Sequence, residues 1–191
     1  MKKIAAMVLA TFVLLSAATA AFAKAKSSTD TRSMETGNFE VDGSFGFATG
    51  PNDFDSGYGL NFGAGYMLTE IDKNLQVRLD LSYFEFSYTP NSPGYDLYYT
   101  RVPFTVSARY YFPIINRLSA FAQAGLETSF DSKDYVEFGN KHTKDEVNLG
   151  ISPGGGIEFF INRDVSVFAG GRWHVVSDGY FSTQFGGAFH F

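Results

Sequence analysis

The chain has 191 residues, 15 basic and 20 acidic side chains, no cysteine, and a formal net charge of −5 at pH 7. The acidic balance argues against nucleic acid and anionic lipid as electrostatic partners, and the lack of cysteine excludes a disulfide framework and a lipidated N-terminal cysteine. Its 21 Phe, 11 Tyr and 20 Gly favour strands and tight turns, and the length suits one domain.

The first 23 residues have the pattern of a secretory signal peptide. Lys2 and Lys3 precede an apolar run, and Ala21-Phe22-Ala23 offers a small-x-small cleavage site. Cleavage there would leave 168 residues with a net charge of −7. An uncleaved anchor is the alternative, but the small residues before the site suit processing better. Because residues 24–36 are polar and aperiodic, we expect a flexible leader there and a single domain at 37–191.

After residue 37, apolar and polar residues alternate with the period of a β-strand. No later segment approaches the ~20 apolar residues of a membrane helix, so any membrane span must be a closed barrel of strands. Clusters of turn-forming residues separate the alternating segments. We expect eight strands, near residues 39–47, 58–68, 75–83, 98–112, 120–127, 147–159, 165–175 and 181–191.

Three places depart from simple alternation. At Tyr83-Phe84 the aromatic run moves from odd to even positions, which predicts a β-bulge or a strand that leaves the membrane. Pro103 is unusual inside a strand because proline has no N–H to donate. In segment 120–127 the two faces differ little in polarity. Phe121 is placed on the polar face only by its odd position in the alternation.

The connections between strands alternate in length. Outer-membrane barrels keep short turns in the periplasm and long loops outside, so this parity predicts that both chain ends are periplasmic. It also makes 130–146 the largest predicted extracellular loop. The long connections are 49–57, 89–96, 130–146 and 176–179, and the short ones are 70–74, 113–117 and 162–164.

The composition of the polar face favours a membrane barrel over a soluble β-sandwich or lipocalin-like barrel. Many glycines stand beside arginines on that face, as expected for a crowded interior in which long side chains cross the lumen. Aromatic residues gather at the ends of the opposite face, where an interfacial girdle would lie. We therefore predict an all-β, eight-stranded, antiparallel up-and-down transmembrane β-barrel.

The C-terminus resembles the assembly signal of bacterial outer-membrane proteins. A polar residue is followed by glycine two positions later and by hydrophobic residues at the third-last and last positions, namely Gln184, Gly186, Phe189 and Phe191. Thr183 stands where an aromatic residue is often found. The resemblance implies insertion by the outer-membrane assembly machinery.

Internal motifs are similar to the outer-membrane β-barrel domain superfamily, which includes OmpA-, OmpX- and OmpW-like proteins. They are Val102-Pro103-Phe104 leading to Ala108-Arg109-Tyr110-Tyr111-Phe112, Phe121-Ala-Gln-Ala-Gly125, and Gly154-Gly-Gly156-Ile-Glu158. The resemblance covers residues 37–191. It implies a monomer in the outer membrane of a bacterium, surrounded by lipid and lipopolysaccharide.

Charged residues on the predicted inner face form the main candidate site. They could be a selectivity lining, but eight strands leave an interior just wide enough for side chains, and an unpaired buried charge is costly. We therefore expect an ion-pair network that fills the lumen. Its predicted members are Arg78, Asp80, Arg101, Arg109, Glu127, Glu158, Arg172 and His174.

No pattern predicts a cofactor or a metal ion. Residues 154–156 are glycines that continue into a strand, so they are no phosphate loop. The acidic residues of segment 130–146 fit no calcium-loop spacing. We read that segment as a solvated loop.

Catalysis has little support from the spacing of residues. A resemblance to lipid A modifying barrels of the deacylase type would require a His-x-Ser pair and a carboxylate, because base and nucleophile must project from one face. His174 has Val176 at that spacing, Ser177 should face the opposite side, and Ser182 lies across the predicted hairpin from His174. We therefore expect no catalytic residues and no enzyme.

Three functions follow in decreasing order of support. The first is a structural or surface-interaction barrel that anchors extracellular loops, with 130–146 as the contact surface. The second, implied by the resemblance to OmpW-like proteins, is a narrow conduit for small hydrophobic molecules. The third is a lipid A modifying enzyme.

Overall fold

The computed structural model describes residues 37–50, 54–88, 97–137 and 140–191, so the predicted signal peptide (1–23) and leader (24–36) lie outside the described residues. All regular elements in the described part are strands. It contains no helix long and apolar enough to cross a membrane. The strands are β1 (Phe39–Ala48), β2 (Gly57–Met67), β3 (Leu75–Tyr88), β4 (Leu97–Ile115), β5 (Leu118–Glu137), β6 (Asn140–Ile151), β7 (Gly154–Phe160), β8 (Val165–His174) and β9 (Tyr180–His190).

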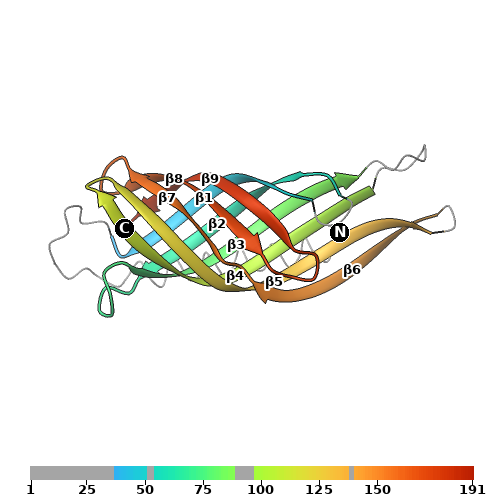
Figure 1. Cartoon of the computed structure of the whole chain (residues 1–191), viewed down its shortest axis with the longest axis horizontal. Helices are drawn as coiled ribbons and strands as arrows, with labels where there is room; N and C mark the ends of the chain where they lie inside the picture. The colour runs from blue at the N-terminus through green and yellow to red at the C-terminus, as the bar shows by residue number, and fades with distance from the viewer. Residues whose placement is uncertain (1–36, 51–53, 89–96, 138–139) are drawn as a thin grey trace.

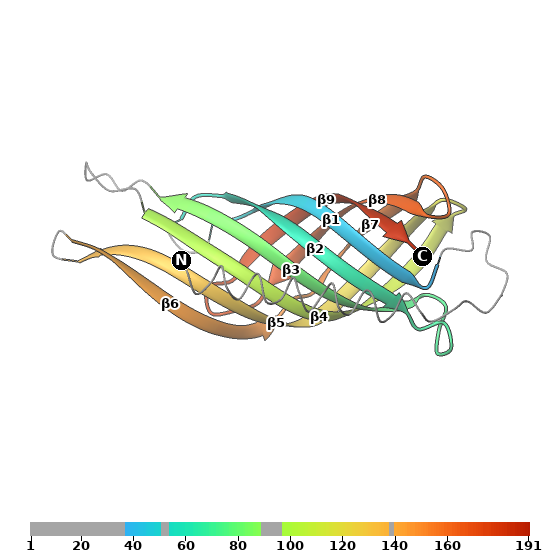
Figure 2. The same ribbon diagram turned by 180° about the vertical axis from the view of Figure 1, so that it is seen from behind.

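Eight of these strands form a closed antiparallel ring, which Figures 1 and 2 show from opposite sides. The order is β4-β3-β2-β1-β9-β8-β7-β5, and β5 pairs back to β4. Closure removes the unpaired edges that an open sheet would expose. The predicted eight-stranded antiparallel barrel is confirmed, with β6 as an additional strand outside the ring.

The alternation of residues decides which face is inside. In β2 the inward positions are mostly glycines beside Asn61, whereas Tyr58, Leu60 and Phe62 point outward and are 43–56% exposed. Charged side chains are buried while large apolar ones are exposed, the reverse of a soluble protein. This distribution fits a barrel with a lipid-facing exterior.

The segment predicted as one strand at 147–159 is two strands, and the segment predicted as a loop at 130–146 is mostly a β-hairpin. β5 continues to Glu137. It pairs with β7 from Leu118 to Gln123 and with β6 from Leu126 to Glu137, and we call the β7 end of the barrel lower and the β6 end upper. Ser152 and Pro153 separate β6 from β7, because proline cannot donate to the ladder. Figure 1 shows β5 and β6 projecting beyond the other strands. Residues 140–147 of β6 are all exposed, so their charges do not prevent strand pairing.

The bulge predicted at Tyr83-Phe84 is absent. The β3–β4 register is the same at Leu81↔Phe104 and at Phe84↔Arg101. Phe84 is 1% exposed because it points into the barrel, where it packs with other aromatic rings. Pro103 lies between those two pairs, where the β3–β4 ladder is interrupted because proline has no N–H to donate, while β4 stays paired with β5 at Pro103↔Ser129.

The absence of native cysteine allows a direct test of orientation. Tyr135 lies on the projecting hairpin, and Ile71 lies in the β2–β3 turn at the opposite end, where it is 75% exposed. We expect a membrane-impermeant maleimide to label Tyr135→Cys on intact cells, and to label Ile71→Cys after the outer membrane is permeabilised. Mass spectrometry of the purified variants measures the labelling. The reverse pattern would show that the chain ends are extracellular.

Candidate functional site

Arg78 is the centre of an ion-pair network in the lower half of the lumen. Its guanidinium contacts Glu40 and Asp42 of β1 and lies 3.1 Å from Asp80 Oδ1. Gly63 makes this possible from the intervening strand β2: a Cβ there would lie 2.8 Å from Asp80 Oδ1 and would also meet Arg78 and Asp42. The glycine on the polar face therefore leaves the space that the guanidinium fills.

The network continues across the barrel. Arg172 Nη2 of β8 donates to Asp80 Oδ2 at 2.8 Å, and Gln76 Nε2 donates to Glu40 Oε2 at 2.7 Å. Arg109 Nη1 of β4 lies 3.8 Å from Glu40 Oε1. These side chains come from four different strands, and the Arg172–Asp80 pair joins β8 to β3 on opposite walls of the barrel.

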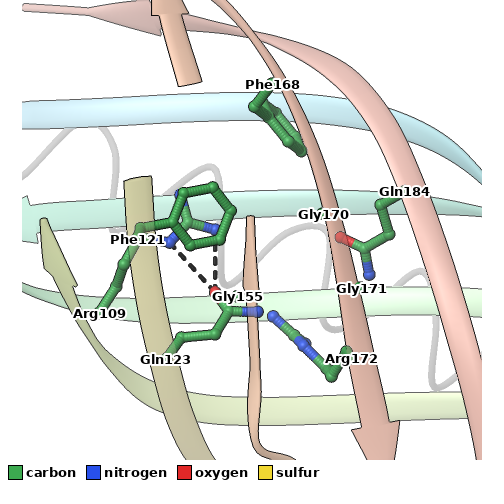
Figure 3. Close-up of a pocket in the computed structure, with 9 residues that line it drawn as sticks. All are labelled: Arg109, Phe121, Gln123, Gly155, Phe168, Gly170, Gly171, Arg172 and Gln184. Carbon is green, nitrogen blue, oxygen red and sulfur yellow. Dashed lines mark hydrogen bonds between the residues drawn. The ribbon is translucent and has the colours of Figure 1, made fainter. Parts of the chain in front are cut away.

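A small cavity lies beside this network (Figure 3). Arg109 donates from Nε and Nη2 to Gln123 Oε1 at 3.1 and 3.0 Å, and the Phe121 ring lies 4.1 Å from the Arg109 guanidinium carbon. Figure 3 shows Arg172 and Gln184 on the facing wall. The cavity volume is about 10 Å³, which is room for about one water molecule. The lumen at this level is therefore filled by side chains.

The upper lumen is closed by a second charge cluster and by aromatic rings. Arg101 donates to both carboxylate oxygens of Asp131, at 2.9 and 2.7 Å, and its Nη1 donates to the Asp178 carbonyl at 2.8 Å. The guanidinium lies between the rings of Tyr99 and Tyr180, 5.0 and 4.9 Å from their centroids. The buried residues that pack here are Ala48, Phe84, Phe86, Tyr99 and Tyr180.

Three polar side chains form a chain of hydrogen bonds just below these rings. Glu127 Oε2 lies 2.6 Å from His174 Nδ1, and His174 Nε2 lies 2.9 Å from Ser182 Oγ. All three side chains are buried. Glu127 is paired with Gly150 of β6, and a Cβ at Gly150 would lie 2.6 Å from Val176 Cγ1.

A second histidine cluster lies at the end of the lumen near the C-terminus, and we call it the lower histidine cluster. Ser166 Oγ lies 2.9 Å from His190 Nε2, and Glu158 Oε1 lies 3.4 Å from the same nitrogen. Ligand atoms of Glu40, Glu158 and His190 lie within 4.8 Å of one another, so among the described residues this trio could hold a metal ion. Glu40 already contacts Arg78, whose positive charge opposes a second cation.

The structure brings the predicted lumen residues into two groups. Arg78, Asp80, Arg109, Arg172 and Glu158 belong to the lower lumen, and Arg101, Glu127 and His174 to the upper lumen; all are buried. Glu40 and Asp42 also belong to the network but are not among the predicted members. Their positions on the polar face of the first strand would have indicated them. The predicted loop at 130–146 includes Asp131, but in the structure Asp131 lies on β5 and pairs with Arg101.

The predicted assembly-signal residues all lie on β9 or just after it. Gln184 points inward, whereas Phe189 and Phe191 point outward and are 45% and 61% exposed. Gly186 permits β9 to approach β1 closely, since a Cβ there would meet the Gly43 carbonyl oxygen. β9 is thus the strand that closes the ring against β1.

A closed antiparallel ring with an apolar exterior and a filled polar lumen defines a small transmembrane β-barrel. The family model described as "Outer membrane protein beta-barrel domain" matches residues 7–186. The chain belongs to this family, which places it in the bacterial outer membrane. No curated protein matches the chain significantly by sequence.

Solved structures of small barrels from bacterial outer membranes are similar in fold. The outer membrane protein OprG from Pseudomonas aeruginosa has a TM-score of 0.67 at 12% identity, over 84% of this chain and 99% of that one. Neisserial surface protein A has a TM-score of 0.55 at 19% identity, over 81% and 97%. Ail, the attachment invasion locus protein of Yersinia pestis, has a TM-score of 0.55 at 13% identity, over 82% and 99%.

Proposed function

We propose that this protein is a monomeric surface-interaction barrel that anchors and presents a projecting hairpin outside the cell. The observation that carries this function is the extension of β5 and β6 beyond the ring, above a lumen filled with paired side chains. We call residues 134–137 and 140–146 the surface hairpin. Strands anchored in a barrel hold such a segment in one conformation, which lowers the entropy lost on binding.

Side chains of the surface hairpin are organised by contacts with one another. Lys141 Nζ and Thr143 Oγ1 each lie 2.8 Å from the carboxylate of Asp134. Partial burial raises the pKa of Asp134, but the hydrogen bonds from Lys141 and Thr143 outweigh this and hold it below its ordinary value. The rings of Tyr135 and His142 stack at 5.6 Å. A stacked aromatic pair beside fixed charges is a suitable surface for a polar macromolecular partner.

Export and assembly follow from the two ends of the chain. The proposal includes export with cleavage near Ala23 and insertion by machinery that reads Gln184, Gly186, Phe189 and Phe191. Lipid and lipopolysaccharide then surround the apolar exterior. Two structural neighbours support a surface role, because one is a Neisserial surface protein and the other is an attachment invasion locus protein.

One observation favours a conduit for small hydrophobic molecules as the second candidate. β6 and β8 are joined by a single bridge, Ile151↔Val175, and above it the described part of β6 pairs with β5 alone. We call this place the β6–β8 seam. A solute entering there would still meet the buried side chains of the lumen, so the surface role remains the stronger proposal.

Shortening the surface hairpin tests the proposed function. We expect a variant that lacks residues 134–143 to remain a folded, heat-modifiable barrel, because β5 pairs with β4 no further than Lys133. Adhesion of expressing cells to epithelial monolayers and to immobilised matrix glycoproteins should fall to that of non-expressing cells. Ile71→Ser, at the opposite end, is the control that should retain adhesion.

Transport measurements on the same purified protein separate the two candidates. In planar bilayers and in liposome uptake of small hydrophobic solutes, we expect the values of protein-free membranes, because side chains fill the lumen. Clear flux through the intact protein would reject the surface role in favour of the conduit. Adhesion that survives the loss of the hairpin would also count against it.

A further inference from the structure

We propose that Ser182, His174 and Glu127 form a hydrolase site for acyl esters within the upper barrel, with Arg172 stabilising the oxyanion. The two ring nitrogens of His174 have different partners: Glu127 Oε2 at 2.6 Å from Nδ1, and Ser182 Oγ at 2.9 Å from Nε2. This is the order in which a carboxylate orients a base and the base activates a nucleophile. The proposal does not depend on the surface role.

The absence of a His-x-Ser pair does not prevent this arrangement, because the residues meet through the β8–β9 hairpin. His174 pairs with Tyr180, and Ser182 is two residues further along β9 on the same inward face. Glu127 comes from β5, next to Gly150 of β6. Spacing along one strand therefore carries no information about this relay.

The lower histidine cluster contains similar residues but lacks the same order. There Ser166 and Glu158 both approach Nε2 of His190, and Ser166 Oγ also donates to Glu158. A carboxylate on the same nitrogen as the hydroxyl does not leave that nitrogen free to take the serine proton. Ser166 is therefore a matched comparison for Ser182, since both are buried serines that touch a histidine.

Arg172 supplies the second, independent observation. Its Cα is paired with that of Ser182 in the β8–β9 ladder, and Asp80 fixes its Nη2 at 2.8 Å. Among the described residues, its Nε and Nη1 have no hydrogen-bond partner although both are buried. Paired residues of neighbouring strands share a face of the sheet, so a turn of the Arg172 side chain toward Ser182 would bring these cationic donors to the negative charge of a tetrahedral intermediate. Figure 3 shows the Arg172 guanidinium directed into the small cavity, which none of the three relay residues lines.

The surroundings indicate an ester of an apolar acyl chain. The β6–β8 seam lies at the level of the relay, since Val175 follows His174 directly and bridges to Ile151. Outside this seam Leu149 and Trp173 are 77% and 55% exposed, on the surface that lipid chains cover. The Tyr180 ring stacks on His174 at 4.0 Å and covers it, so the ring must move when substrate enters.

The reaction is an ordinary ester hydrolysis with water as co-reactant. Ser182 Oγ forms a bond to the acyl carbon, its proton passes to His174 Nε2, and Arg172 donates to the oxyanion. The bond to the alcohol oxygen then breaks, and the alcohol leaves with the proton from His174. Water attacks the acyl-serine, His174 takes its proton and returns it to Ser182, and the carboxylic acid is released.

The test uses the purified mature protein in detergent micelles. The probes are the 4-nitrophenyl esters of butyrate and decanoate, and a fluorophosphonate whose adduct is located by mass spectrometry. We expect decanoate to be hydrolysed faster than butyrate and the adduct to lie on Ser182. Ser182→Ala and Glu127→Gln should lose more than tenfold of the rate, whereas Ser166→Ala should retain it within twofold. Tyr180→Ala should react faster with the fluorophosphonate than the unmodified protein.

Heat-modifiable migration on gels shows that each variant is folded. The proposal is overturned if neither the unmodified protein nor folded Tyr180→Ala hydrolyses either ester or carries an adduct at Ser182. It is equally overturned if folded Ser182→Ala keeps the full rate, or if Ser166→Ala removes as much activity as Ser182→Ala does. Failure of these assays leaves the adhesion measurements unaffected.

Discussion

Replacing Arg78 by methionine is expected to lower the free energy of unfolding by about 3–5 kcal/mol, the usual cost of removing one partner from a buried ion pair. Arg78 is 1% exposed and contacts Glu40, Asp42 and Asp80. Methionine fills a similar volume but leaves three carboxylates together without their shared cation. The measurement is urea unfolding in detergent micelles, followed by the fluorescence of Trp173, the single tryptophan.

Two further variants make this result specific to the buried charge. Lys144→Met removes an exposed charge paired with Glu146, and we expect no measurable change in the free energy of unfolding, because water screens exposed pairs. Adding Asp42→Asn to Arg78→Met should restore part of the loss, because one uncompensated charge is removed. If Arg78→Met were as stable as the unmodified protein, the lumen network would not hold the barrel together.

The inward positions of this barrel follow from the sequence because the side-chain period of a strand is two. A shift of one residue would expose every buried side chain, so parity alone assigns Arg78 and Arg172 to the lumen. The assignment does not depend on which strands are neighbours. It therefore holds even for Phe121, whose segment shows little contrast between its faces, and whose side chain is 5% exposed.

Contacts across the ring do not follow from that period. The Glu127–His174 bond joins residues 47 positions apart, and it depends on the register of β5, β6 and β8. The alternation of apolar and polar residues does not predict the surface hairpin either, because strands with water on both faces have no apolar face. The charged residues that follow Asp131 make the sequence predict a loop there, although β5 carries Asp131 into the lumen and into contact with Arg101.

Two glycines of the inner wall, Gly156 and Gly170, lie against the ring of Phe121. A Cβ at Gly156 would lie 2.7 Å from both Phe121 Cζ and Gly170 Cα, and would also meet the Ala169 carbonyl oxygen. The Phe121 ring fills the space over β7 and β8 that two glycines leave. Because backbone atoms are among the obstacles, rotation of the ring cannot relieve the clash. We expect Gly156→Ala to lower the free energy of unfolding by about 1–3 kcal/mol.

Gly43→Ala is the matched control on the outward face of β1. There a Cβ would meet only the Phe62 ring, at 3.8 Å, which is ordinary van der Waals contact. Since alanine loses less backbone entropy than glycine on folding, this variant should be unchanged or more stable by about 0.5–1 kcal/mol. The same urea titration compares the two substitutions. Equal losses would mean that glycine is needed for strand flexibility in general, whereas a loss confined to Gly156 would show that the glycines of the inner wall are there to admit the side chains that fill the lumen.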